Sequence, residues 1–417
     1  MTKSPEEKLD GNAPRPSRRS LAGLDWFTFC LADVQTAFGP FVSVYLTTQK
    51  WTQIDIGLVL TVGSIATLIG QMPGGALVDA ARSERTAAAI AVVGICLSAL
   101  TLAVWPIFPL VLAARIIHAA SSCVLVPAIA AISLGLVGHA AIGERLGRNA
   151  RFASLGTGLA AAGMGACGYF LSSRAVFLVA VVLALPTLVA LAQIRTEEID
   201  PDRAHGGIDP PPPILLRQGL RRLATNVPLV IFALCTALFQ FANAAILPLT
   251  GSVMTMRSSD WGPVLIATCI IVPQLVVAAI SPWVGRRAES WGRRPLLIIG
   301  FAALPIRAIL FAAAPDPVSL VAIQMLDGIS AAVLGVLTPL VVADLARDTG
   351  HFNLAQGVVG TGVGIGAALS TTFAGYLADR HGIQVAFFGL ATVAFFGFLL
   401  VALAMPETRR KITLPAN

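Results

Sequence analysis

Residues 383–405 read IQVAFFGLATVAFFGFLLVALAM, an apolar run without a single charge. At a rise of about 1.5 Å per residue, roughly 20 apolar residues suffice for a helix to cross the hydrocarbon core of a bilayer. The run therefore predicts a transmembrane helix. The whole chain shares this character, because 56% of its 417 residues are hydrophobic and only 12% are charged. Soluble domains carry roughly 25% charged residues, so lipid must be the solvent of this chain.

Eleven runs of the same kind precede this one, and together they predict an all-α polytopic membrane protein with twelve transmembrane helices. The expected spans are residues 24–46, 54–79, 87–105, 107–137, 150–171, 174–194, 227–250, 261–284, 295–314, 317–344, 353–378 and 383–405. The run 107–137 exceeds an upright span, so it must tilt or project from the membrane. The polar residues before the first run indicate no cleavable signal peptide.

A polar segment at 195–226 divides the spans into six and six. Four prolines at 210–213 should hold it extended, and residues 214–223 predict an interfacial helix with leucines in lipid and arginines toward headgroups. The expected organisation is an N-terminal tail (1–23), a six-helix bundle (24–194), this linker (195–226), a second six-helix bundle (227–405) and a C-terminal tail (406–417).

The net charge of +7 reports topology rather than a nucleic-acid partner. With the N-terminus in the cytoplasm, 23 of the 29 Lys and Arg residues fall in the tails and in the loops on that side. This positive-inside bias predicts that both termini are cytoplasmic. We therefore expect a monomeric, multi-pass protein of the inner, or cytoplasmic, membrane. Its expected partners are membrane lipid, protons and a small-molecule substrate.

The two halves of the chain are related in sequence, because four pairs of features recur at offsets between 204 and 210 residues. The pairs are Gly75-x-x-x-Asp79 with Gly285-x-x-x-Glu289, Asn149 with Asn353 (each seven residues before a Gly-Thr-Gly triplet), Pro40 with Pro248, and Gly168-Tyr169 with Gly375-Tyr376. They indicate a duplicated six-helix unit. Because each unit has an even number of spans, both copies insert the same way up, as in the parallel repeats of secondary transporters.

The signature loops carry a family resemblance. Gly285-Arg286-Arg287-Ala288-Glu289-Ser290-Trp291-Gly292-Arg293-Arg294 is similar to the GxLADRxGRR signature of the major facilitator superfamily. The loop that starts at Gly75 keeps the Gly, Leu and Asp of that signature but lacks its second glycine, and Arg115 with Ala119 resembles the RxxxG signature. The chain resembles this superfamily from the first span to the twelfth. The resemblance implies two pseudo-symmetric six-helix bundles around a central cavity.

Ionisable groups inside a span cost several kcal/mol unless they have a partner or face water, so each is a functional candidate. Asp33 and Arg115 lie at similar depths, on spans that the resemblance places along the cavity. Asp327 lies near the middle of span ten, at the repeat position of His118. We expect Asp33, Arg115 and Asp327 to couple transport to protons. A static ion pair that braces the first bundle is the alternative for Asp33 and Arg115.

Uncharged polar residues supply the candidates for a substrate site. They are Gln35 on span one, His118 on span four, Gln240 and Asn243 on one face of span seven, and Gln324 on span ten. Hydrogen bonding between helices is the alternative for Gln240 and Asn243, and a bond to a backbone carbonyl is the alternative for His118. Arg307, deep in span nine, must turn inward, and the sequence offers no partner for it.

The signature loops also predict a cytoplasmic gate, since an acid beside arginines at a helix end can hold neighbouring helices together. The expected gate residues are Asp79, Arg82, Glu289, Arg293, Arg294 and Asp344. In this interpretation Glu289 pairs with Arg293 and Arg294. For the degraded Asp79 loop, arginines that only anchor the topology are an equal alternative.

These features predict a secondary active transporter that works by alternating access and exports a small amphiphilic organic molecule or drug in exchange for protons. The alternatives are a proton-coupled importer of a polar metabolite or iron chelate, and a non-transporting membrane sensor. No nucleotide-binding loop occurs, and no cluster of His, Asp or Ser indicates an enzyme. No cofactor or metal site is expected, since the six cysteines lie within spans and none has CxxC spacing.

Overall fold

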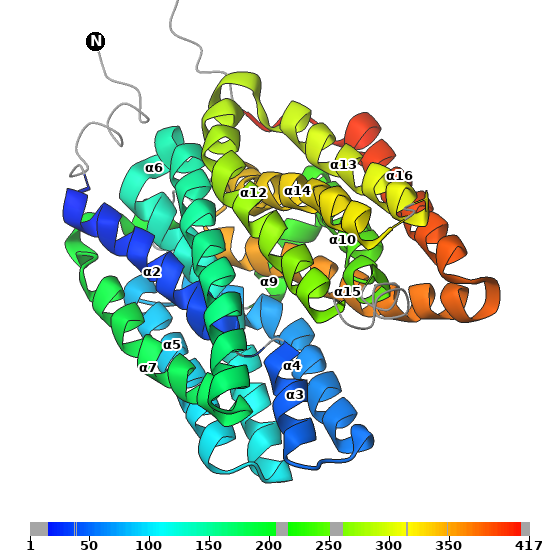
Figure 1. The fold of residues 1–417 in the computed structure, drawn as a ribbon. Coiled ribbons are helices and arrows are strands. Elements are labelled where there is room, and N and C mark those ends of the chain that lie inside the picture. The colour runs from blue at the N-terminus through cyan, green and yellow to red at the C-terminus, as the bar shows by residue number, and fades with distance from the viewer. Residues whose placement is uncertain are drawn as a thin grey trace, which may run out of the picture.

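The computed structural model describes residues 16–36, 38, 40–205, 216–250, 262–313, 316–347 and 349–409, and these residues form helices and loops without a strand. The helices lie in two groups (Figure 1). In chain order they are α2 (Arg18–Thr36), α3 (Pro40–Thr48), α4 (Gln53–Asp79), α5 (Glu84–Val104), α6 (Phe108–Phe170), α7 (Ser173–Ala192), the 3-10 turn η1 (Thr196–Glu198), α8 (Pro201–His205), α9 (Leu216–Ala224), α10 (Val227–Asn243), α12 (Gly262–Trp291), α13 (Arg293–Ala313), α14 (Pro317–Leu345), α15 (Phe352–His381) and α16 (Ile383–Ala404).

Ten of the described helices are long and apolar enough to cross a membrane. One of them, α6, makes two crossings, because Gly138 adopts φ 67° and ψ 177° and breaks the helix there. Glycine tolerates this positive φ, since it has no Cβ. α2 and α3 together make one further crossing, interrupted between Thr36 and Pro40. The predicted all-α fold with twelve transmembrane helices is therefore confirmed.

The fifth crossing begins earlier than the sequence predicted. Its helix resumes directly after Gly138, rather than at residue 150. Arg145 and Arg148 consequently lie on the helix and not in a loop. Hydropathy places the start of a span where the charges end, whereas the helix itself extends beyond the hydrocarbon.

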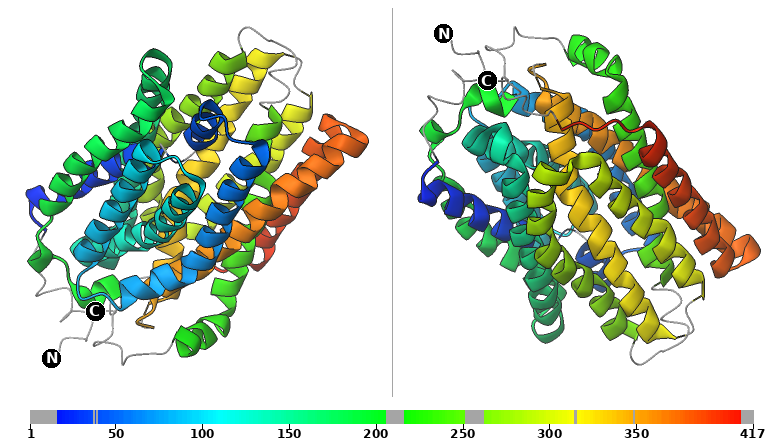
Figure 2. Two further views of the ribbon diagram at one scale, coloured as in Figure 1. Left: turned by 90° about the horizontal axis from the view of Figure 1, so that it is seen from below. Right: turned by 90° about the horizontal axis from the view of Figure 1, so that it is seen from above.

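Each group of helices has its own hydrophobic core. One core is built from residues between Leu24 and Ala204, and the other mainly from residues between Leu223 and Met405. Four buried α6 residues, Ala130, Leu134, Ile142 and Leu146, belong to the second core. Figure 2 shows the two groups from opposite sides, the first in blue to green and the second in green to red. α6 thus connects the two bundles.

The described parts of the linker, residues 195–205 and 216–226, lie at one end of the molecule, which we call the linker end, and the opposite end is the far end (Figure 2). The first part of the linker is bonded to the first bundle. The backbone N–H of Asp200 donates to the carbonyl oxygen of Gly135, and Glu198 accepts hydrogen bonds from the backbone and hydroxyl groups of Ser17. Ala204 in the same part of the linker also accepts a hydrogen bond from the side chain of Asn353 on α15 at 3.5 Å, so this part contacts both bundles.

The second part of the linker, α9, packs on the second bundle. Leu223 is 2% exposed and belongs to the core of that bundle. The prediction that the leucines of this helix face lipid is wrong for Leu223, because α9 lies against α10 and α15. The side chains of Leu216 and Leu220 lie outside the described residues. Arg221 and Arg222 are exposed, as predicted for the polar face.

The two bundles touch along two seams at the linker end. α4 lies against α15, and α6 lies against α12. A Cβ atom on Gly75 would collide with the carbonyl group of Asn353, and one on Gly147 would lie 2.5 Å from the carbonyl oxygen of Ser281. Glycine at these positions lets the backbones approach closely, so small residues set the contact between the bundles.

The seams do not continue to the far end. About five helical turns contain 18 residues, so Gly57 and Gly165 lie on the same helix faces as the seam glycines of α4 and α6. A Cβ atom on Gly57 or Gly165 would meet no atom within 4 Å. α15 repeats the contrast, since Gly357 is in backbone contact across the seam and Gly375 is open. The described helices therefore touch at the linker end and part toward the far end.

Gly75→Ala should loosen the linker end, because the added methyl group collides with the backbone of Asn353 across the seam. We expect faster amide hydrogen exchange in the first turn of α15, measured by mass spectrometry on the full chain in detergent. Gly57→Ala is the matched control on the same face of α4 and should leave this exchange unchanged. Equal exchange in the two variants would contradict the seam.

Candidate functional site

Arg307 and Asp327 form an ion pair inside the second bundle. The guanidinium of Arg307 on α13 donates to the carboxylate of Asp327 on α14 and to the side-chain oxygen of Asn243 on α10. The Arg307 side chain is 2% exposed and the Asp327 side chain 25%. A cation buried to this extent is tolerated because a carboxylate neutralises it and a second acceptor bonds to it, although its Nε–H has no acceptor among the described residues. Asp327 and Asn243, both predicted site residues, thus meet at Arg307, whose partner the sequence did not identify.

The first bundle holds Arg115 and His118 on α6, beside the break in the first crossing. Nη1 of Arg115 donates to the carbonyl oxygen of Phe38 at 3.3 Å. The His118 ring stacks on the ring of Phe38 with centroids 3.8 Å apart, and its Nε2 lies 3.5 Å from the hydroxyl oxygen of Ser122. The side chain of Asp33 lies outside the described residues, so its pairing with Arg115 stays a prediction.

The other predicted binding residues have different surroundings. Gln35 and Gln240 are half-buried. Gln324 is buried, and its carboxamide oxygen has no hydrogen-bond partner among the described residues. His118 and Asp327 do not meet, because each makes its contacts within its own bundle. A substrate that used both residues would have to span the space between the bundles.

Asp79, at the end of α4, reaches across a seam to the first turn of α15. One carboxylate oxygen accepts hydrogen bonds from the backbone and side-chain nitrogens of Asn353, at 3.1 and 2.8 Å, and the other accepts from the backbone N–H of Leu354 at 2.8 Å. The two backbone donors are N–H groups that a helix N-terminus leaves unpaired, and the helix dipole also favours an anion there. Burial and nearby Arg222 lower the pKa of His351, the residue before α15, so this imidazole stays neutral.

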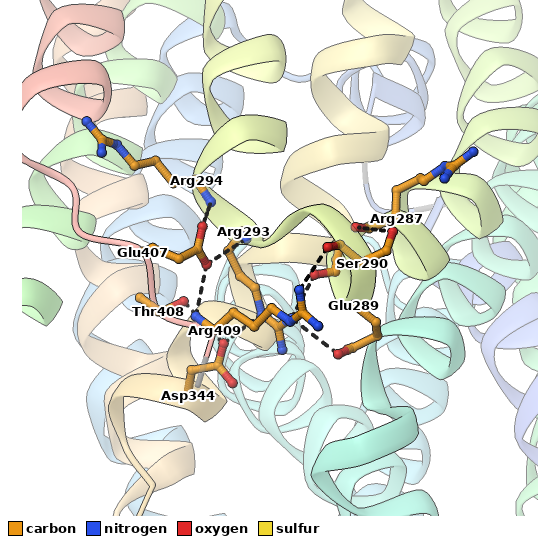
Figure 3. A network of polar contacts seen from close by, with 10 residues as sticks. Arg287, Glu289, Ser290, Arg293, Arg294, Asp344, Glu407, Thr408 and Arg409 are labelled. Atoms are coloured by element: carbon orange, nitrogen blue, oxygen red, sulfur yellow. Dashed lines mark hydrogen bonds and ion pairs between the residues drawn. The ribbon is translucent and has the colours of Figure 1, made fainter. Parts of the chain in front are cut away.

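Glu289, at the repeat position of Asp79, bonds within its own bundle (Figure 3). It pairs with Arg293 at 3.2 Å, and Nε of Arg293 donates to Asp344 at 2.8 Å. Arg294 instead donates to the carbonyl oxygen of Ala402 at 2.6 Å. The predicted pairing of Arg294 with Glu289 is wrong, because consecutive helical residues point about 100° apart and Arg294 turns toward α16. Arg82 is exposed at the linker end.

The chain that follows α16 crosses this loop, a contact that the sequence did not predict. Glu407 accepts hydrogen bonds from the first two backbone N–H groups of α13, at 2.8 and 3.1 Å (Figure 3). Thr408 donates to Asp344 at 3.1 Å, and Arg409 donates to the carbonyl oxygen of Ser290 at 2.8 Å. Glu407 thereby caps α13 and fastens the C-terminal segment to the signature loop.

A further buried ion pair joins α2 to α6 near the linker end. Arg145 and Asp25 are 4% and 3% exposed, and Arg148 also donates to Asp25 at 2.9 Å. Arg145 donates in addition to Asn149 at 2.8 Å. Sequence reasoning missed this cluster, because Asp25 falls at the edge of the expected first span and both arginines precede the expected fifth. Their spacing of three residues, which places them on one helix face, is the signal that could have found them.

Comparison with known proteins decides the family. The family model described as Major Facilitator Superfamily matches residues 24–286 and 232–417. The chain belongs to the major facilitator superfamily. An uncharacterized MFS-type transporter of Mycobacterium tuberculosis is 40% identical over 406 residues, which cover 96% of this chain and 96% of the relative. Membership makes this chain a multi-pass membrane transporter.

Two further proteins are similar to this chain over different extents. Multidrug resistance protein 1 of Bacillus subtilis is 26% identical over 166 residues, which are 40% of this chain and 41% of the relative. The crystal structure of the Escherichia coli fucose:proton symporter matches 94% of this chain and 98% of its own with a TM-score of 0.74, at 14% sequence identity. The structural likeness shows the fold.

Arg307→Met should destabilise this superfamily member, because it leaves the Asp327 carboxylate without its cation. Breaking a buried pair on one side costs about 3–5 kcal/mol. The double variant Arg307→Met/Asp327→Asn should recover part of this loss, since no unpaired charge remains. Thermal unfolding in detergent measures both, with Arg151→Met, an exposed arginine on α6, as the control. A double variant as unstable as the sum of the two single variants would show that the pair is not coupled.

Proposed function

We propose that this transporter is a proton-coupled exporter, which moves a small amphiphilic organic molecule out of the cell by alternating access. The observation that carries the proposal is the Arg307–Asp327 pair, an ion pair held inside a crossing where charge is expensive. In this proposal the linker end faces the cytoplasm, in accord with its excess of Lys and Arg residues. The protein would then lie in the cytoplasmic membrane and present a closed cytoplasmic side.

Alternating access would use the two seams. The glycine contacts at Gly75 and Gly147 bring the bundles together at the linker end, and Asp79 bonds one bundle to the start of α15. Rocking of the bundles would break the Asp79 bonds and separate the seams, while the far end closes. Glu289, Arg293 and Asp344 hold the second bundle together and can move with it as one body.

Coupling to protons would act through Asp327 and Asp33. Protonation of Asp327 removes the negative charge that holds Arg307, and the cation must then find another acceptor or turn. Deprotonation restores the pair. Because the pair joins α13 to α14 and contacts α10, its state can influence how these helices pack. Asp33 is the second titratable acid of this proposal and lies on the first crossing of the first bundle.

Export is favoured over import by two features. The crossings are apolar and carry few charges, which suits an amphiphilic molecule better than a strongly hydrated one. A relative that matches part of the chain is named a multidrug resistance protein. An importer of a polar metabolite would need the opposite direction of flow, so the direction of proton-driven transport separates the two functions.

Purified protein in inside-out proteoliposomes with an acidic interior should accumulate at least one probe from a panel of ethidium, rhodamine 123 and 8-anilinonaphthalene-1-sulfonate, while the interior becomes more alkaline. Asp327→Asn should abolish the proton movement, since a carboxamide does not take up and release a proton as a carboxylate does. A pH-sensitive dye in the lumen gives the measurement.

Glu197→Gln, which alters an exposed acid in η1, is the matched control and should behave like the unaltered protein. Proton movement in Asp327→Asn equal to that of the unaltered protein would contradict the assigned role of Asp327. A probe driven only in the opposite direction would indicate import, and no proton movement with any probe would contradict proton-coupled export of this class of molecule.

A further inference from the structure

Arg115 is a half-buried arginine inside a crossing. It differs from the three buried arginines in the kind of partner that it has. Arg145 is paired with Asp25, Arg293 with Asp344, and Arg307 with Asp327. Among the described side chains, no carboxylate forms an ion pair with Arg115. Its single hydrogen bond goes to the carbonyl oxygen of Phe38, and its Nε–H is buried without an acceptor.

The position of Arg115 is fixed on one side. A Cβ atom on Gly63 of α4 would lie 3.0 Å from both Nε and Nη2 of Arg115, so the guanidinium rests directly on the backbone of α4. The absence of a side chain at Gly63 makes this contact possible. A guanidinium has five N–H donors in a planar fork, and one is used here. The remaining donors are suited to a planar anion such as a carboxylate.

An aromatic surface lies one helical turn from the guanidinium. The rings of His118 and Phe38 stack at 3.8 Å with an angle of 18° between their planes, and His118 is only partly buried. The hydroxyl group of Ser122 lies 3.5 Å from the Nε2 of His118, which fixes the far edge of that ring. Arg115 and His118 are three residues apart on α6, so they lie on one face of the helix.

We propose that Arg115 binds the anionic group of the transported molecule, and that the substrate is a small organic acid. Its carboxylate or sulfonate group supplies the counter-charge that Arg115 lacks among the described side chains, and its aromatic or apolar body lies against the partly buried ring of His118, which the buried ring of Phe38 supports from behind. A lone cation in hydrocarbon costs several kcal/mol, and an anion that neutralises it removes much of this cost. The inference deepens the proposed transport function and rests on it.

The positive charge of Arg115 should determine the sign of the charge on the ligand. Arg307 in the second bundle is already neutralised by Asp327, whereas the positive charge of Arg115 in the first bundle has no carboxylate partner among the described side chains. A monoanion balances that charge, whereas a cation would be repelled by it and a neutral analogue would leave it unpaired. The site therefore discriminates by charge first and by shape second.

The test uses the full chain in nanodiscs of phosphatidylcholine, a lipid without net charge, and three probes with one skeleton. They are 1-naphthoate, 1-naphthamide and 1-naphthylmethylammonium. Because a ligand that binds the folded state raises the melting temperature, naphthoate should stabilise the unaltered protein, and the amide and the ammonium probe should not. Arg115→Gln should weaken naphthoate binding about tenfold or more, the effect expected for losing a charge-assisted hydrogen bond.

Arg151→Gln, an exposed arginine on the same helix, is the control and should bind naphthoate like the unaltered protein. If Arg115→Gln does not yield folded protein, Arg115→Lys keeps the charge without the planar fork and should still weaken binding.

Equal stabilisation by the three probes, no stabilisation by naphthoate, or unchanged naphthoate binding in Arg115→Gln would each overturn the proposal. The result is separable from the proposed function. Proton movement driven only by cationic probes would keep proton-coupled export and remove the organic acid. Naphthoate binding at Arg115 without proton movement would keep the site and remove the coupling.

Discussion

At the linker end, one carboxylate bonds the first bundle directly to the second. Asp79 ends α4 in the first bundle and accepts three hydrogen bonds from the first residues of α15 in the second, where a helix presents unpaired N–H groups and the positive end of its dipole. These bonds form only because the backbones come close, and glycines such as Gly75 allow that approach. The same spacing is absent five turns away, so one end of the molecule is held and the other is free to part.

The arginines near the middle of the crossings have different partners in the two bundles. In the second, Arg307 is neutralised by Asp327 and steadied by Asn243, so a change in protonation alters the packing of three helices. In the first, Arg115 is held by a carbonyl oxygen and by the backbone at Gly63. The duplicated unit has therefore diverged in the proposed scheme. One bundle carries the exchangeable proton on a paired acid, and the other offers a cation to the substrate.

Much of the fold follows from the sequence, because hydropathy and repeated features are properties of single segments. The twelve crossings and the membership of the superfamily were predicted in this way. The side-chain pairs were harder, since they depend on which helix faces meet. Nothing near Arg307 in the sequence identifies Asp327 as its partner. The two signature loops also differ from expectation, because the sequence favoured the Glu289 loop rather than the Asp79 loop as the contact between helices at the gate. The degraded loop with Asp79 bonds across the seam, whereas the better-preserved loop with Glu289 bonds within its own bundle.

Alternating access around these seams is tested most directly by two distances in one preparation. Spin labels at Arg82 and Arg286 report the linker end, and labels at Leu171 and Val318 report the far end, in a variant without the native cysteines. If Asp79 holds the seam as an anion, acidification should lengthen the first distance and shorten the second, and Asp79→Asn should do the same at neutral pH. The account would be contradicted if both distances lengthened or both shortened, or if the linker end stayed closed in Asp79→Asn.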